Sequence, residues 1–209
     1  MKVLIADDHD VVRRGLKQIL EEEFHAIKFG EARNAEEAIA LASKQTWDVV
    51  ILDINMPGKS GFEAMKEIRA ARPKLPILIL SVQPEDQYAI PVLKAGASGY
   101  LTKDSASAEL VNAFKKVASG GKYVSPSIAE KLASSLTDAR DKAPHELLSV
   151  REFQVMRLLS SGKTPSQIAS ELKLSVQAVS TYRSRILQKL KITNNADLVR
   201  YAMQNGLVH

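Results

Sequence analysis

The sequence has no cysteine among its 209 residues and only four histidines, none of them paired at metal-binding spacing. Without thiols the chain forms no disulfide, thiolate zinc site or iron–sulfur cluster, and it has no cysteine nucleophile. No apolar run approaches the roughly 20 residues that a membrane-spanning helix needs. An acidic pair, Asp7-Asp8, follows the first apolar residues too early for a signal peptide. We therefore expect a cytoplasmic protein without a histidine-rich metal site.

What is present is typical of a globular protein, with 45% hydrophobic and 25% charged residues. The length is about one and a half typical domains, which favours two compact units. The charge is unevenly distributed: residues 1–121 hold 16 basic and 17 acidic side chains, whereas residues 148–209 hold 9 basic and 3 acidic. The positive excess of the last 62 residues predicts an anionic partner for that end of the chain.

Five short apolar runs alternate with amphipathic helical patterns in the first 121 residues. The central runs are almost continuously hydrophobic, which is typical of parallel strands buried on both faces. Five strand–helix units in this length predict an α/β domain with a flavodoxin-like doubly wound (βα)5 architecture. The expected strands are Val3–Ala6, Ala26–Glu31, Val49–Ile54, Ile77–Val82 and Ser98–Leu101.

The rest of the chain has no strand-like runs. Residues 122–147 are expected to form a linker with a short helix, Ser127–Leu136, and a polar stretch, Thr137–Glu146. Residues 148–209 are expected to form an all-α domain of four helices, because helix-capping sequences recur along them. The expected N-caps are Ser149, Thr164, Ser175 and Asn194.

Chemically active side chains follow the predicted strands of the first domain. Ligands bind at the carboxyl ends of the strands in an open parallel sheet, so side chains that follow several strands meet at one edge. A divalent cation such as Mg²⁺ would stabilise three carboxylates held together there, and one carboxylate could act as a nucleophile towards phosphorus. The residues expected at this edge are Asp7, Asp8, Asp53, Ser81 and Lys103.

These residues stand in motifs that resemble the receiver domain of two-component response regulators. The resemblance implies that Asp53 is the phosphoacceptor. It implies that Asp8, Asp53 and the main-chain carbonyl of Asn55 bind Mg²⁺ directly, while Asp7 binds it through water. The motifs are Asp7-Asp8, Leu52–Gly58 with Gly61, Ser81, and Tyr100–Lys103.

The same resemblance assigns the remaining polar groups of this edge. It implies that Lys103 pairs with the phosphoryl group, that Ser81 donates a hydrogen bond to it, and that the rotamer of Tyr100 reports activation. Many receivers have a proline with a cis peptide bond after the lysine. Here Asp104 occupies that position, so the resemblance does not imply a cis bond.

In the second domain, a short helix at Pro165–Leu172 and a tight turn lead into a longer helix, Val176–Leu190. Helix, turn and second helix is a DNA-binding arrangement. At 100° per residue, one face of the longer helix gathers Val179, Tyr182, Ile186 and Leu190, which we expect in the core. The opposite face gathers Gln177, Ser180, Thr181, Ser184 and Gln188, with Arg185 beside them and Arg183 and Lys189 at the flanks.

Motifs between residues 148 and 190 resemble the LuxR-type helix-turn-helix, and the whole chain resembles the NarL/FixJ subfamily of response regulators. The resemblance implies a transcription regulator that is phosphorylated by a sensor histidine kinase and binds double-stranded DNA as a homodimer through its last helix. It implies no enzymatic activity beyond self-phosphorylation of Asp53 and its slow hydrolysis. The expected DNA contacts are Gln177, Ser180, Thr181, Arg183, Ser184, Arg185 and Lys189.

Two other functions remain open from the sequence. The first is a regulator that binds DNA whatever its phosphorylation state, which the intact set of pocket residues argues against. The second is a magnesium-dependent phosphotransferase or phosphatase acting on small molecules. That enzyme would need a general acid beside Asp53, where the sequence has Asn55, and it would leave the basic domain unexplained.

Overall fold

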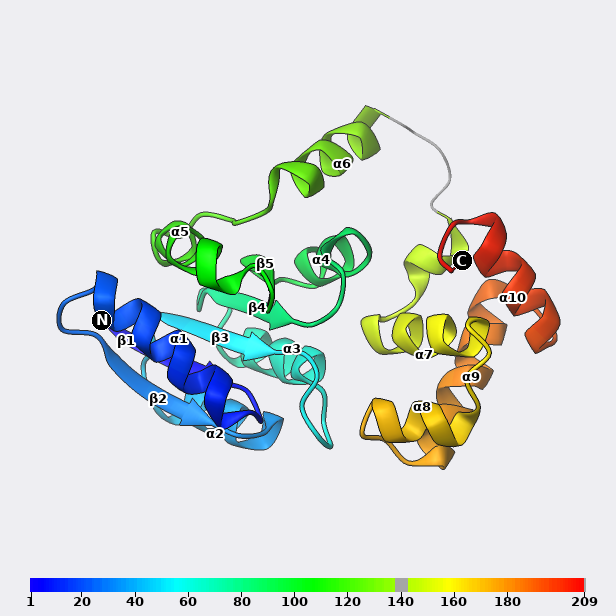
Figure 1. The fold of residues 1–209 in the computed structure, drawn as a ribbon, viewed down its shortest axis with the longest axis horizontal. Helices are drawn as coiled ribbons and strands as arrows, with labels where there is room; N and C mark the ends of the chain where they lie inside the picture. Colours follow the sequence, from blue (N-terminus) through cyan, green and yellow to red (C-terminus); the bar gives the residue numbers. More distant parts are fainter. Residues whose placement is uncertain (138–142, 209) are drawn as a thin grey trace. The chain divides into compact units, whose positions relative to one another are not determined.

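The computed structural model describes residues 1–137 and 143–208 (Figure 1). Contacts within the chain divide it into two compact units, Met1–Asp138 and Ala139–His209. The first unit is α/β and the second is helical, as the sequence predicts. Within the described ranges, no helix is long and apolar enough to cross a membrane.

The sheet of the first unit has five parallel strands in the order β2-β1-β3-β4-β5. Every residue of β3 and β4 is buried, which confirms the prediction of a sheet covered on both faces. Strand β2 begins two residues later than predicted, because Ala26 adopts a left-handed turn conformation with φ of 63°. The strands are β1 (Lys2–Ala6), β2 (Lys28–Ala32), β3 (Val49–Asp53), β4 (Ile77–Ser81) and β5 (Gly99–Thr102).

Five helices connect and cover these strands. Helices α1 and α5 pack together on one face, where Leu16, Leu20 and Phe114 meet alternate residues of β1, β3 and β4. Helices α2 and α3 pack side by side, and α4 packs against β5. The helices are α1 (Asp10–Glu23), α2 (Ala35–Lys44), α3 (Gly61–Ala71), α4 (Glu85–Lys94) and α5 (Ala106–Ala118).

Residues 122–137 of the expected linker lie with the first unit. The Tyr123 N–H donates to the Ser98 carbonyl (2.9 Å), and Tyr123 forms a bridge beside Gly99 at the edge of β5. Helix α6 (Pro126–Thr137) then packs against α4 and buries Ile128 completely. Half of the polar stretch predicted for Thr137–Glu146, residues 138–142, lies outside the described residues. Of the described half, Thr137 is the last residue of α6 and Pro144 begins a 3₁₀ turn.

The second unit opens with a 3₁₀ turn, η1 (Pro144–Leu147), followed by four helices. Ser149 and Thr164 form the capping boxes that the sequence predicts, and Ser175 and Asn194 also accept a hydrogen bond from the first helical turn. Lys173 makes the tight turn between the second and third helices with φ of 54°. The four helices are α7 (Val150–Ser160), α8 (Pro165–Glu171), α9 (Val176–Leu190) and α10 (Asn195–Gln204).

Candidate functional site

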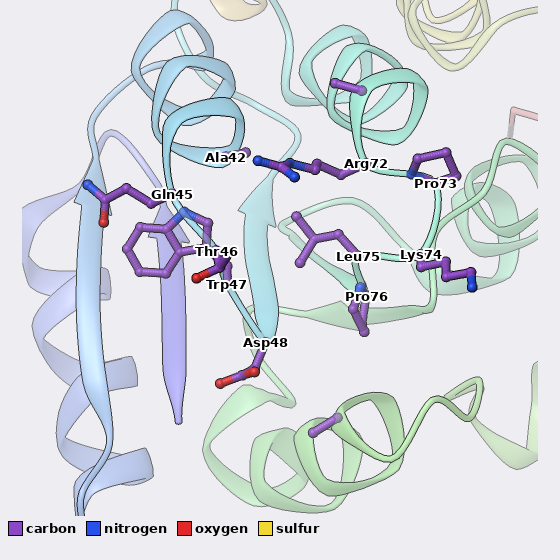
Figure 2. A pocket seen from close by; sticks show the side chains of 12 residues that line it. Ala42, Gln45, Thr46, Trp47, Asp48, Arg72, Pro73, Lys74, Leu75 and Pro76 are labelled. Atoms are coloured by element: carbon purple, nitrogen blue, oxygen red, sulfur yellow. The ribbon is translucent and has the colours of Figure 1, made fainter.

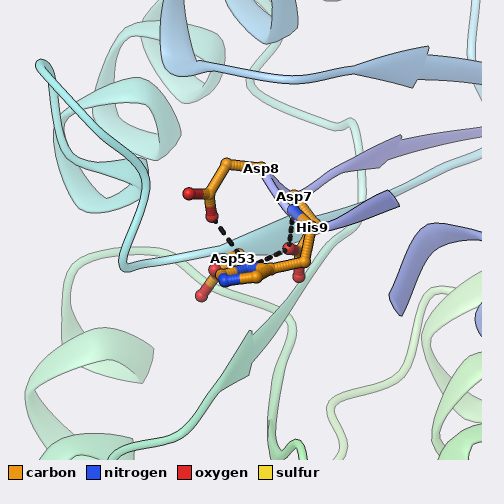
Figure 3. A group of neighbouring side chains, drawn as sticks. All are labelled: Asp7, Asp8, His9 and Asp53. Atoms are coloured by element: carbon orange, nitrogen blue, oxygen red, sulfur yellow. Dashed lines mark hydrogen bonds and ion pairs between the residues drawn. The ribbon is translucent and has the colours of Figure 1, made fainter. Parts of the chain in front are cut away.

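The carboxylates predicted to converge lie together at the carboxyl edge of the sheet. One side-chain ligand atom from each of Asp7, Asp8, His9 and Asp53 lies within 4.8 Å of the others (Figure 3). Asp7 and Asp8 follow β1, and Asp53 is the last residue of β3. Asp7 and Asp53 are each only 1% exposed. Four residues from two strand ends therefore form one acidic cluster.

The loop after β3 is shaped by glycine. A Cβ atom at Gly61 would lie 1.8 Å from the main-chain oxygen of Asp53, so only glycine lets α3 begin this close to the strand end. The Gly61 N–H donates to the Ile54 carbonyl (3.0 Å), and the Asn55 N–H donates to Oδ1 of Asp53 (3.0 Å). These contacts hold the Asp53 carboxylate at the edge of the cluster.

Lys103 joins the third and fifth strands at the same edge. Its Nζ lies 2.9 Å from Oδ2 of Asp53 and 2.7 Å from Oδ2 of Asp7. The main-chain N–H of Lys103 donates to the Ser81 carbonyl (2.8 Å), which fixes the start of the β5–α5 loop beside β4. The prediction that Lys103 and the carboxylates meet at one edge is confirmed.

Burial and charge act in opposite directions on these groups. Burial raises the pKa of Asp53, and the positive charge of Lys103 and the Asn55 N–H only partly offset it. For Lys103, burial favours the neutral amine, but the carboxylates of Asp53 and Asp7 outweigh it and raise the pKa. Lys103 therefore stays protonated, while Asp53 is more basic than an exposed aspartate.

Ser81 and Tyr100 are both buried beside the loop between β4 and α4. The Ser81 hydroxyl accepts a hydrogen bond from the Gln83 N–H (3.1 Å), and the Tyr100 hydroxyl donates to the Gln83 carbonyl (2.9 Å). Burial raises the pKa of Tyr100 well above its ordinary value. Gln83, which the sequence did not single out, thus links the strand-end hydroxyl to the buried phenol.

His9 is a site residue that the sequence analysis did not assign. Its Nδ1 lies 3.1 Å from Oδ1 of Asp7 and 3.0 Å from Oδ1 of Asp8, and its N–H donates to Asp7 (2.8 Å). The signal was its position directly after the acidic pair, at the start of α1. Its side chain is 59% exposed, so it closes the cluster on the solvent side.

The donor set of the cluster fits a hard divalent cation. Carboxylate oxygens are the ligands that Mg²⁺ prefers, and it retains several waters when only a few protein ligands are available. Asp7, Asp8 and Asp53 offer such oxygens within 4.8 Å of one another.

An open pocket of about 660 Å³ lies at the other end of the sheet (Figure 2). Its wall includes Asp48 and Pro76, which directly precede β3 and β4. The ring nitrogen of Trp47 donates to the Leu41 carbonyl (2.9 Å) and is already paired. This pocket is separated from Asp53 by the length of the strands and takes no part in the acidic cluster.

In the second unit, α9 has the two faces that the sequence predicts. Val179, Ile186 and Leu190 are buried and Tyr182 is half-buried. The opposite face is exposed, and two of its hydroxyls, those of Thr181 and Ser184, donate to carbonyls one turn earlier. The exposed residues of this face are Gln177, Ser180, Thr181, Ser184, Arg185 and Gln188.

The three cations of α9 have different surroundings. Nε of Arg183 donates to Oδ1 of Asn195 at the start of α10 (2.7 Å). Nζ of Lys189 lies 2.6 Å from Oε2 of Glu152, a buried carboxylate that caps α7. Arg185 makes no hydrogen bond or ion pair to the part of the chain that the structure describes. Arg185 is therefore the cation of α9 most available to an anionic ligand.

Comparisons with known proteins match both units. Residues 3–115 match the family described as the response regulator receiver domain, and residues 146–202 match the bacterial regulatory proteins of the luxR family. The chain therefore belongs to the two-component response regulators that join a receiver to a LuxR-type DNA-binding domain, the NarL/FixJ arrangement.

Individual relatives align with almost the whole chain. The chain is 35% identical to the response regulator GacA of Pseudomonas aeruginosa, over 100% of this chain and 98% of the relative. It is 36% identical to the response regulator UvrY of Escherichia coli K12, over 99% and 95% of the two chains.

Solved structures agree with the fold. RcsB of Salmonella enterica serovar Typhimurium, bound to the promoter rprA with the phosphomimetic BeF₃⁻, is 27% identical with a TM-score of 0.62, and the alignment covers 96% of this chain and 98% of RcsB. Another RcsB structure, from Salmonella typhimurium, is 28% identical with a TM-score of 0.58 over 97% and 98% of the two chains.

Proposed function

We propose that this regulator is switched by phosphorylation of Asp53. A carboxylate oxygen of Asp53 attacks the phosphorus of the donor, the bond between phosphorus and the donor atom breaks, and the leaving group keeps the bonding electrons. The buried carboxylate of Asp53, 2.9 Å from the ammonium of Lys103 in an acidic cluster, is the observation that carries this proposal. Lys103 then balances charge on the transferred phosphoryl group.

The cluster supplies the cation site that this chemistry needs. Asp8, Asp53 and the Asn55 carbonyl would bind Mg²⁺ directly, and Asp7 would bind it through water. When bound, the cation neutralises charge on the phosphoryl oxygens. A sensor histidine kinase is the proposed physiological donor, and reaction with a small acyl phosphate requires only the residues of this chain. The protein catalyses no reaction beyond this transfer to itself and the slow hydrolysis of the product.

We propose that α9 enters the major groove of double-stranded DNA in the bacterial cytoplasm. Its exposed face carries hydrogen-bonding side chains for base edges, and cations at its borders face phosphates. A homodimer formed through α10 would place two such helices on half-sites about 10 bp apart. The proposed contacts are Gln177, Ser180, Thr181, Arg183, Ser184, Arg185 and Lys189.

A physical route leads from Asp53 towards the second unit. Phosphorylation adds about two negative charges, which draws Ser81 and Lys103 towards Asp53. Movement of Ser81 changes the Gln83 loop and the hydrogen bond from Tyr100. The Gln83 loop leads directly into α4. Helix α6, the last helix before the second unit, packs against α4. We propose that this path alters dimerisation or the freedom of the DNA-binding unit.

Labelling with a phosphodonor tests the proposal. Incubation with Mg²⁺ and acetyl phosphate should give one acid-stable, base-labile adduct, which Asp53→Ala loses. Phosphorylated protein should bind duplex DNA more tightly than unmodified protein. Equal DNA affinity of the two forms would favour the regulator that ignores phosphorylation. Absence of the adduct in wild-type protein, with Mg²⁺ present, would contradict the assignment of Asp53.

A further inference from the structure

Arg13 is a buried cation that the function described so far does not use. It lies one turn into α1 and its side chain is only 3% exposed. Its Nη1 donates to the main-chain oxygen of Asp7 (2.7 Å). Its Nε donates to Oε2 of Glu31 in β2 (2.8 Å), and its Nη2 bonds to Asp10. One guanidinium therefore ties together the end of β1, the start of α1 and the neighbouring strand.

Arg13 contacts Asp7 just beyond the end of β1, where the hydrogen bonds between the strands stop. Strand β1 ends at Ala6, and the Asp7 N–H still donates to the Ala32 carbonyl of β2 (3.1 Å). The Asp7 carbonyl lies beyond the ladder, and a buried carbonyl requires a partner. Arg13 supplies that partner. Because Arg13 is itself anchored on Glu31, the carbonyl of the peptide between Asp7 and Asp8 is held in position.

We propose that Arg13 is a positioning residue for the divalent cation, acting through the backbone of the acidic pair. This inference rests on the proposed magnesium site. Asp7 and Asp8 share the peptide that Arg13 fixes, so the orientation of both carboxylates depends on it. Without the guanidinium the peptide can rotate, and the cluster is no longer preorganised for a metal that demands a narrow range of geometry.

Calorimetric titration of the full chain with MgCl₂ tests this without reference to phosphorylation. Arg13→Met keeps most of the buried volume and removes every donor, so we expect the Mg²⁺ dissociation constant to rise roughly 10-fold or more. Phosphorylation by acetyl phosphate should slow at low Mg²⁺ and recover when Mg²⁺ is raised to saturate the variant. A merely structural role would not give that rescue.

Lys17→Met is the matched control. Lys17 lies on the same helix and bonds to the same Glu31 (2.6 Å), but it does not reach Asp7. Its Mg²⁺ dissociation constant should stay within about twofold of the wild-type value. If Arg13→Met does not fold, Arg13→Lys retains the charge but has a single donor group that cannot bond Asp7 and Glu31 with the fork of arginine.

The outcomes separate the two proposals. A folded Arg13→Met or Arg13→Lys protein with wild-type Mg²⁺ affinity would overturn the role of Arg13 and leave the magnesium site intact. Wild-type protein that binds no Mg²⁺ would overturn the proposed site itself. Weakened binding in both Arg13 variants, with Lys17→Met unchanged, supports the inference.

Discussion

At the scale of single residues, Asp53 carries a stability cost in the unphosphorylated protein. Its unfolded carboxyl has the ordinary pKa of 3.8, and burial raises the folded value. The folded state therefore binds the proton more tightly than the unfolded state, and stability decreases as the pH rises from 3.8 through the folded pKa. Above that range the folded protein holds a buried negative charge.

Asp53→Asn should therefore be more stable than wild type at pH 7 in the absence of Mg²⁺. The gain should shrink below pH 3.8, where Asp53 is protonated in both states. Urea unfolding at pH 7 and pH 3.5, with both proteins free of metal, measures the difference. A gain that is the same at both pH values would show that ionisation of Asp53 is not its cause.

Arg185 and Lys189 lie on the same helix, but replacing each with methionine should have different effects on the free energy of unfolding. Arg185→Met removes an unpaired, exposed cation, so the free energy of unfolding should change by less than about 0.5 kcal/mol. The slope of log K for DNA binding against log salt concentration should decrease in magnitude by about 1, as for one lost phosphate contact. Fluorescence anisotropy on a labelled duplex over a salt series measures the slope.

Lys189→Met should instead lower stability, by about 1–3 kcal/mol, because it leaves the buried carboxylate of Glu152 without its cation. Lysine pairing and the hydrogen bonds from Ser149 hold the pKa of Glu152 below its ordinary value although burial acts to raise it. Urea unfolding of the two variants decides between the roles. Equal stabilities would contradict the assignment of Lys189 to the α7 cap.

At the scale of elements, α4 is a helix interrupted by a proline. Pro91 lies inside it and removes one hydrogen bond from its ladder. Its first turn follows the Gln83 loop that contacts Ser81 and Tyr100, and its surface carries α6. These features make α4 the element whose displacement would pass a change at Asp53 to the chain that follows.

A single thiol at Ile128 reports that displacement, because the natural chain contains no cysteine. Ile128 lies in α6 and is completely buried within the first unit, so the thiol of Ile128→Cys should react slowly with a maleimide. With Mg²⁺ and beryllofluoride, labelling should accelerate roughly tenfold or more, equivalent to about 1.4 kcal/mol less protection. Mass spectrometry over time gives the rate.

Ala38→Cys provides the comparison for this experiment. Ala38 is also fully buried, but it lies in α2, away from the Gln83 loop. Its labelling rate should not change with beryllofluoride. Parallel acceleration at both positions would indicate general loosening, and no acceleration at Ile128 would exclude α6 from the signalling path.

At the scale of the whole molecule, the two units differ in net charge. The first 121 residues are nearly neutral overall and hold the acidic cluster, whereas the last 62 carry nine basic and three acidic side chains. Phosphorylation has to shift a conformational equilibrium, and a change from 1:99 to 99:1 requires about 5.5 kcal/mol. Dimerisation and DNA binding can each contribute part of that free energy.

DNA affinity of the phosphorylated full chain should fall steeply with salt. A protein that neutralises about six phosphates loses roughly 10³-fold in affinity between 50 and 200 mM salt. Anisotropy titrations at fixed Mg²⁺ measure this dependence. A flat response would mean that the basic second unit does not bind the DNA backbone.

The sequence by itself determined which polar residues follow the strands, and where the helices of the second unit begin. Strands buried on both faces leave apolar runs, and in a parallel sheet the residues after those runs must share an edge, which placed Asp53 and Lys103 together. Helix caps are local, so Ser149 and Thr164 could be predicted from neighbours three residues away. Both kinds of pattern depend on short stretches of chain.

Only the tertiary structure decided which side chains hold these groups in place. Arg13 bonds to Glu31 18 positions away, and Lys189 bonds to Glu152 37 positions away. Helix α6 packs against α4, so residues 122–137 belong to the first unit. Periodicity shows that a side chain faces inward, but its partner depends on which distant segments the fold brings beside it.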